Sequence, residues 1–184
     1  SFPCSAPRRL PIGLWREPVQ EVGLATAASM LTDSGLRFTT HCRSGFFTMP
    51  EGVERRASID DNRIAIEEAA TLAAAGAPGS TAILVLVAGG LPEGSRDIVG
   101  ARERVRDAIG ELAPYAASAG VTLAIEPLHP MFASDRCVVS TLGQALDIAA
   151  DFDPAVVGAT VDTFHIFWDP DVLPAIERAG REGR

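Results

Sequence analysis

Val121-Thr-Leu-Ala-Ile-Glu126 and Val156-Val-Gly-Ala-Thr-Val-Asp162 are two apolar runs that each end in an acidic residue. Runs that are nearly continuous in apolar residues are typical of buried parallel strands. Parallel α/β folds bind their ligands at the carboxyl ends of the strands, where an unpartnered buried carboxylate is costly. We therefore expect Glu126 and Asp162 to bind a divalent metal ion together. The alternative is that each caps a neighbouring loop or pairs with an arginine.

Strand-like and helix-like segments alternate along the chain. Strands are expected at residues 10–15, 36–41, 81–87, 121–126 and 156–162. Helices are expected from Pro18 to before Gly35, from after the loop that ends at Pro50 up to Gly76, over residues 96–119 and 141–150, and from Asp169-Pro170 to Gly180. Pro114 should kink or divide the helix at residues 96–119. Five such units predict an α/β fold with a parallel sheet and helices outside it. The sheet could be part of an eight-stranded barrel or an open doubly wound sheet; length favours the open sheet, since a full barrel typically needs ~250 residues.

Composition narrows the class of protein. The chain has 184 residues, 47% of them hydrophobic, which suits a single domain over residues 1–184. Its formal net charge of -8 argues against a nucleic-acid partner, and the absence of lysine excludes Schiff-base catalysis. No apolar run approaches the ~20 residues of a membrane span. The three scattered cysteines favour a reducing, cytoplasmic compartment.

Two histidines closely follow the acidic residues. His165 ends the stretch Asp162-Thr-Phe-His165, and His129 lies in Glu126-Pro-Leu-His129. An imidazole in such a loop could bind the metal or form a hydrogen bond with a substrate hydroxyl group. The alternative is that each histidine is purely structural. A third, His41, ends the second expected strand and should lie near the same edge.

Aromatic and basic residues also gather at the ends of the expected strands. Trp15 and Trp168 could hold a sugar against a ring face, or they could simply pack as part of a core or lid. Arg43 and Arg136 could hold an anionic group such as phosphate, or they could pair with an acidic residue. The sequence thus predicts a small-molecule site at this edge and leaves the ligand open.

The stretches Leu123-Ala-Ile-Glu126-Pro-Leu-His129-Pro130 and Val161-Asp162-Thr-Phe-His165 resemble the xylose isomerase-like sugar phosphate isomerases and epimerases. The superfamily also contains endonuclease IV. The resemblance implies an eight-stranded barrel of which this chain supplies strands two to six, so that it is truncated at both ends. It also implies that Glu126 and Asp162 are the first two of four ligands to Mn, Mg, Co or Zn. His165 matches a histidine that contacts substrate oxygens.

The implied reaction moves a proton between adjacent carbons of a sugar or sugar phosphate through an enediolate. Glu126 would be one of two acidic residues that transfer the proton, and the second belongs to a strand that this chain lacks. Two alternatives are a sugar dehydratase of the same family and a non-catalytic α/β domain. A nuclease like endonuclease IV is disfavoured, since its zinc site is rich in histidine and this chain has three. An incomplete barrel would expose two strand edges, which could pair two copies into a homo-oligomer.

Overall fold

Five parallel strands follow one another in sequence order in the computed structural model, which describes residues 10–184. They are β1 Pro11–Trp15, β2 Arg37–Gly45, β3 Ile83–Val87, β4 Thr122–Glu126 and β5 Val157–Ala159. Every neighbouring pair in the order β1-β2-β3-β4-β5 is parallel. A doubly wound sheet reverses its strand order at a switch point. The open-sheet alternative is therefore wrong, and the sheet is part of a barrel.

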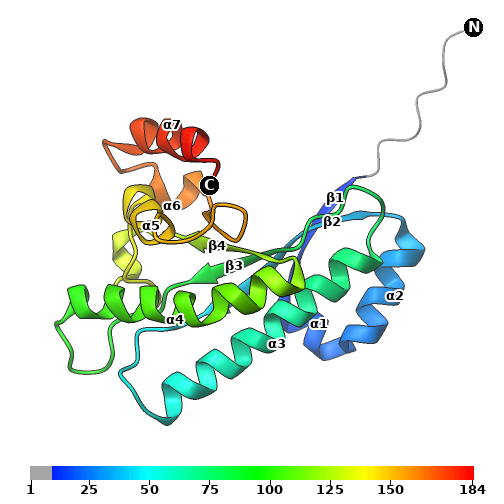
Figure 1. The fold of residues 1–184 in the computed structure, drawn as a ribbon, viewed down its shortest axis with the longest axis horizontal. Coiled ribbons are helices and arrows are strands. Elements are labelled where there is room, and N and C mark those ends of the chain that lie inside the picture. The colour runs from blue at the N-terminus through cyan, green and yellow to red at the C-terminus, as the bar shows by residue number, and fades with distance from the viewer. Residues whose placement is uncertain (1–9) are drawn as a thin grey trace, which may run out of the picture.

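The helices connect successive strands. They are α1 Arg16–Val22, α2 Leu24–Ser34, α3 Val53–Ala75, α4 Ile98–Ala119, α5 Leu142–Ala149, α6 Thr163–Ile166 and α7 Val172–Glu182, with a 3-10 turn, η1, at Pro130–Phe132. Figure 1 shows α1 to α4 on one side of the sheet, where each contacts the next. Helices kept to one side leave the other face of the strands free to line the interior of a barrel.

The main core lies between the sheet and its helices. Leu84 and Leu86 on β3 and Leu123 and Ile125 on β4 are at most 1% exposed. These residues alternate along each strand because successive side chains of a strand point to opposite faces. On β4, Glu126 points to the face opposite that of Leu123 and Ile125, and it is only partly buried. The alternation thus turns the last residue of β4 away from the helices.

Three boundaries before β4 differ from expectation. Gly23, with a φ of 85°, divides the expected first helix into α1 and α2, since glycine tolerates this conformation. β2 continues past His41 to Gly45, which places His41 inside the strand. Pro114 does not divide α4, and the fully buried Leu112 and Ala116 pack on either side of it.

Three later boundaries also differ. β5 ends at Ala159, so Asp162 is not the last residue of a strand; it is the N-cap residue of α6. The last helix begins at Val172 and not at Pro170, because the Asp169 side chain accepts a hydrogen bond of 2.9 Å from the Asp171 N–H and closes a turn ahead of the helix. That helix runs past Gly180 to its end at Glu182.

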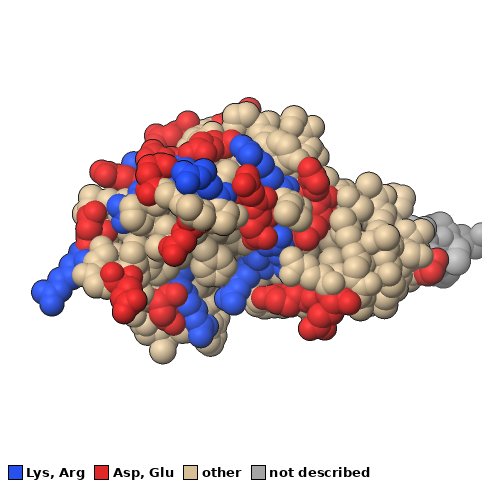
Figure 2. All heavy atoms as spheres, turned by 90° about the horizontal axis from the view of Figure 1, so that it is seen from below, with Lys and Arg blue, Asp and Glu red and all other residues tan. Residues whose placement is uncertain are grey.

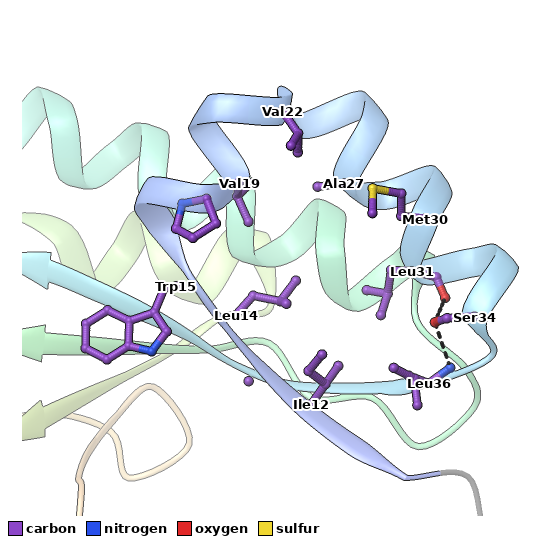
Figure 3. A pocket seen from close by; sticks show the side chains of 12 residues that line it. Ile12, Leu14, Trp15, Val19, Val22, Ala27, Met30, Leu31, Ser34 and Leu36 are labelled. Atoms are coloured by element: carbon purple, nitrogen blue, oxygen red, sulfur yellow. Dashed lines mark hydrogen bonds between the residues drawn. The ribbon is translucent and has the colours of Figure 1, made fainter.

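An apolar pocket of about 450 Å³ lies between β1 and the helices α1 and α2 (Figure 3). Its one hydroxyl group, on Ser34, donates to the Leu31 carbonyl at 2.7 Å and accepts from the Leu36 N–H at 3.2 Å. Among residues 10–184, β1 is an edge strand, so its outer side has no neighbouring strand. The pocket offers no charged group or imidazole and is therefore not the candidate site.

Charges of both signs are mixed on the face of the molecule that the helices cover. Figure 2 shows acidic and basic side chains interspersed on the face that carries α3 and α4. Within residues 10–184, each helix is too short or too polar to cross a membrane.

Candidate functional site

The two predicted acidic residues lie at the carboxyl ends of neighbouring strands. Glu126 is the last residue of β4, and Ile125 beside it pairs with Ala159 at the end of β5. Three residues after Ala159, the Asp162 side chain accepts a hydrogen bond of 2.8 Å from the Phe164 N–H at the start of α6. Asp162 therefore both caps a helix and presents a carboxylate at the same edge as Glu126.

The Glu126 carboxylate lies in surroundings that disfavour its charged form. Burial raises the pKa of Glu126, the charge of Asp162 raises it further, and the charge of Arg43 lowers it. Among residues 10–184, no side chain forms a hydrogen bond or ion pair with the Glu126 carboxylate. A partly buried carboxylate in this state is stabilised by a cation.

The chemistry of the donors fits a hard divalent cation in part. Carboxylate oxygens are the ligands that Mg²⁺ and Mn²⁺ prefer, and Zn²⁺ and Co²⁺ also accept them. In the described part of the chain, however, no three His, Cys, Asp or Glu side chains are grouped closely enough to hold a metal ion. Glu126 and Asp162 thus fit two places in a coordination shell, and the remaining places need water or other groups.

The two predicted histidines lie together beside the carboxylates. The His129 N–H points to Nδ1 of His165 at 3.5 Å, and the Met131 N–H donates to Nδ1 of His129 at 3.2 Å. Because each Nδ1 accepts, each neutral imidazole carries its proton on Nε2. Burial lowers the pKa of His165, the charge of Asp162 opposes this, and His129 lowers it further. His165 is therefore neutral at pH 7 and can donate through Nε2.

Aromatic rings surround the imidazoles. Phe167 stacks on His129 with ring centroids 6.0 Å apart, and Trp168 meets His129 edge-on at 5.9 Å. Nε1 of Trp168 donates to the His165 carbonyl at 2.9 Å, and Phe132 meets the His165 ring edge-on at 5.9 Å. The structure thus brings Trp168 into the same cluster as both histidines.

The other predicted residues occupy the β1 and β2 end of the edge. Arg43 is the extra residue at a register shift in β2, between Cys42, which pairs with Val85, and Ser44. Trp15, at the end of β1, pairs with Cys42 and is 55% exposed, and it borders the apolar pocket. Trp15 thus lies three strands away from Glu126, whereas Arg43 is close enough to act on its charge.

Two cysteines near Glu126 were not predicted. Burial and then the charge of Glu126 raise the pKa of Cys42 to about 12, so its thiol stays protonated at neutral pH. Sγ of Cys137 lies 3.6 Å from the Glu126 carbonyl and 3.1 Å from the Val139 carbonyl. Their separation in the sequence gives no signal that these residues converge.

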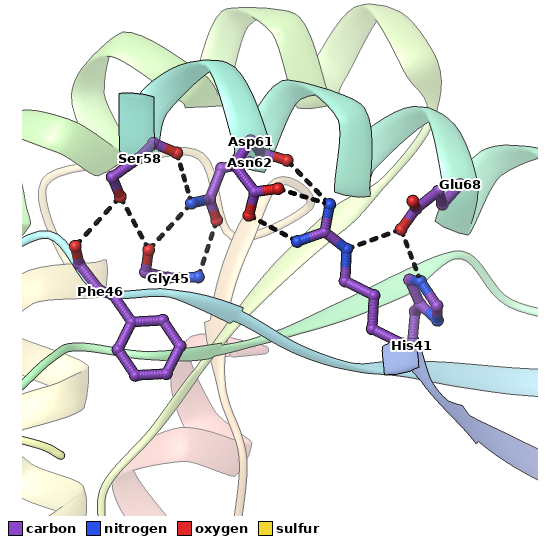
Figure 4. A network of polar contacts seen from close by, with 8 residues as sticks. His41, Gly45, Phe46, Ser58, Asp61, Asn62 and Glu68 are labelled. Carbon is purple, nitrogen blue, oxygen red and sulfur yellow. Dashed lines mark hydrogen bonds and ion pairs between the residues drawn. The ribbon is translucent and has the colours of Figure 1, made fainter. Parts of the chain in front are cut away.

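A buried polar network behind β1 and β2 also escaped prediction (Figure 4). Arg16 donates to Asp61 at 2.5 Å and to Glu68 at 2.8 Å, and Glu68 also contacts His41 at 3.0 Å. The expectation that His41 lies at the ligand edge is therefore wrong: it is fully buried under α3. The signal available was the spacing of Asp61 and Glu68, which lie seven residues apart and therefore share one face of α3.

A parallel sheet wound in sequence order, with carboxylates and imidazoles at the carboxyl ends of its strands, defines the (β/α)-barrel class of protein. The chain belongs to the xylose isomerase-like TIM barrel family, whose sequence profile matches residues 5–182. Among curated proteins, none matches the chain at a significant level.

Solved structures agree with this assignment. Protein SMc04130 from Sinorhizobium meliloti 1021 is 48% identical, with a TM-score of 0.85 over 94% of this chain. D-psicose 3-epimerase with D-tagatose from Clostridium cellulolyticum H10 is 18% identical, with a TM-score of 0.73 over 94% of this chain. The IolI protein with a bound zinc atom is 20% identical, with a TM-score of 0.72 over 94%. The chain spans about 60% of the length of each of these structures.

Proposed function

We propose that the protein is a divalent-metal-dependent isomerase or epimerase of a sugar or sugar phosphate. The observation that supports this most directly is the partly buried carboxylate of Glu126 beside Asp162, which forms no ion pair with any of residues 10–184. Membership of the family and the fold shared with a D-psicose 3-epimerase agree with it. Fold alone does not establish an activity, so the proposal depends on the carboxylates.

The proposed reaction transfers a proton between adjacent carbons of the sugar through an enediolate. Glu126 is the proposed group that takes the proton, and burial beside Asp162 favours its protonated form afterwards. A divalent cation held by Glu126 and Asp162 would stabilise negative charge on the sugar oxygens when bound. His165 donates a hydrogen bond to one of those oxygens through its Nε2 proton.

The aromatic cluster has a separate role in this proposal. The faces and edges of Phe167 and Trp168 are held against His129, and both rings are at least one third exposed. Such rings pack against the apolar C–H face of a sugar, whereas the imidazoles recognise its hydroxyl groups. Orientation of the sugar then depends on the cluster, and the proton transfer depends on Glu126.

Calorimetric titration with Mn²⁺ tests the proposal. We expect the wild type to bind Mn²⁺ and Glu126→Gln to bind it at least about 10-fold more weakly, because a neutral amide replaces a charged ligand. Glu93→Gln, which changes an exposed glutamate in the loop after β3, is the matched control and should bind as the wild type does. Equal heats for the wild type and Glu126→Gln would favour the non-catalytic alternative.

A sugar dehydratase would share the cation and the base, so metal binding does not distinguish it. Product analysis does: an epimerase or isomerase returns a sugar of unchanged mass, whereas a dehydratase releases water and leaves a product lighter by one water molecule. Mass spectrometry of the sugar after incubation with the metal-loaded protein therefore separates the two reactions.

A further inference from the structure

The β2 end of the site contains Arg43, an arginine that forms no ion pair within the described residues. Among residues 10–184, no Asp or Glu oxygen lies within 4.0 Å of the Arg43 guanidinium. Arg136 at the same edge offers a direct comparison, since its Nε lies 3.4 Å from Asp135. Both guanidinium groups lie over an aromatic ring, Arg43 over Phe46 at 5.8 Å and Arg136 over Phe132 at 5.0 Å. The difference between them is the missing carboxylate.

The backbone that follows Arg43, at Gly45 and Phe46, forms hydrogen bonds with α3. Ser58 on α3 donates to the carbonyls of Gly45 and Phe46, both at 3.0 Å. Asn62, one turn further along α3, accepts from the Gly45 N–H at 2.8 Å and donates to its carbonyl at 2.9 Å (Figure 4). Phe46 itself has a φ of 64°, which a bulky residue adopts only when its surroundings impose it.

This arrangement leaves a cation and a ring available at the ligand edge. The Phe46 side chain is 43% exposed. The turn at Gly45 and Phe46 is therefore held by its hydrogen bonds with α3 and not by burial of the ring. The Arg43 guanidinium lies over this ring, and the cation–π contact favours that position of the charged group. The planar fork of an arginine without a carboxylate partner matches the two oxygens of a phosphate or carboxylate group.

We infer that Arg43 and Phe46 form a subsite for the anionic group, phosphate or carboxylate, of the sugar that binds at Glu126 and Asp162. The inference rests on the proposed function of those two carboxylates and adds the class of substrate to it. A sugar anchored by Arg43 at one end extends along the sheet edge from β2 towards β4. Glu126 pairs with Val87 on β3, and Val87 pairs with Gly45, two residues after Arg43, so the two groups lie two strands apart at the same edge, about 10 Å across the sheet.

Three sugars that differ at a single carbon test the inference by calorimetry: D-glucose, D-glucose 6-phosphate and D-glucuronate, with inorganic phosphate as a direct probe. We expect one anionic sugar to bind at least about 10-fold more tightly than D-glucose, as a charge-assisted hydrogen-bond pair provides. Arg43→Gln should remove this preference, and Arg43→Lys should retain part of it. Arg136→Gln is the matched control and should retain all of it. Tighter binding of D-glucose 6-phosphate indicates a phosphate subsite, and tighter binding of D-glucuronate indicates a carboxylate subsite.

Two results would overturn the inference. The first is a preference for an anionic sugar, or binding of inorganic phosphate, that persists unchanged in Arg43→Gln. The second is a wild type that does not bind inorganic phosphate and that either binds all three sugars with equal affinity or binds none of them. Titration of Arg43→Gln with Mn²⁺ separates this failure from failure of the proposed function, because the variant should bind Mn²⁺ at least as tightly as the wild type does.

Discussion

His41 in the middle of β2 and Glu68 on α3 are joined by a hydrogen bond of 3.0 Å between Nε2 and Oε2. The His41 side chain is fully buried and that of Glu68 is 9% exposed. The same carboxylate oxygen accepts a hydrogen bond of 2.8 Å from Arg16 at the start of α1. Glu68 therefore connects the helix that follows β1, the strand β2 and the helix α3, directly behind the candidate site.

We expect the Glu68 contacts to make folding stability depend on pH. Burial opposes ionisation of Glu68, but the hydrogen bonds and charges of His41 and Arg16 outweigh it, so its pKa is lowered below the ordinary value of 4.5. Because the unfolded chain takes up the proton first, this stabilisation is present above about pH 4.5 and is lost as the pH falls through the lowered pKa.

Glu68→Gln should lower the free energy of unfolding at pH 7 by about 1–3 kcal/mol, as expected when a buried charged partner is lost. Its deficit relative to the wild type should shrink at pH 3. Urea unfolding of both proteins at the two pH values measures this. Glu103→Gln, an exposed change within α4, should match the wild type at both. A deficit that is the same at pH 3 and pH 7 would contradict the assignment.

The apolar runs of the sequence predict the strands, because burial under helices imposes nearly continuous apolar character. They do not predict strand order, which depends on how each crossover packs, and length alone favoured the wrong architecture. Glu126 at the end of β4 was predictable since alternation along a strand fixes its face. The partners of Glu68 were not, as Arg16 lies 52 residues away and His41 lies 27 residues away.

Gly45→Ala should destabilise the protein strongly. A Cβ at Gly45 would overlap the backbone carbonyl of Val87 on the neighbouring strand, and the φ of 114° is strained for any other residue. We expect a loss of about 2–5 kcal/mol from the steric overlap and the backbone conformation together. Gly94→Ala is the matched control, because it also has a positive φ but meets no atom within 4 Å. It should cost only about 1–2 kcal/mol. Equal losses in urea unfolding would show that the turn can shift.

Asp162→Asn should separate helix capping from metal binding. Asparagine caps a helix about as well as aspartate does, so the hydrogen bond to the Phe164 N–H should persist and the stability should change by less than about 0.5 kcal/mol. The amide nevertheless removes one of the two charged metal ligands. We therefore expect Mn²⁺ binding to weaken while the thermal unfolding temperature stays constant. Asp162→Ala should lose both properties. Mn²⁺ binding that is intact in both variants would leave Asp162 with a capping role alone.

The two tryptophans should report on opposite ends of the sheet edge. Trp168 packs against His129 and donates to His165, whereas Trp15 pairs in register with Cys42, beside Arg43. In Trp15→Phe, only Trp168 emits, and we expect D-tagatose to change its fluorescence, because a sugar at the imidazoles alters the surroundings of that ring. In Trp168→Phe, only Trp15 emits, and we expect it to respond to inorganic phosphate and not to D-tagatose. If both variants respond to the same ligand, or if Trp15 responds to D-tagatose alone, the edge does not contain two separate subsites.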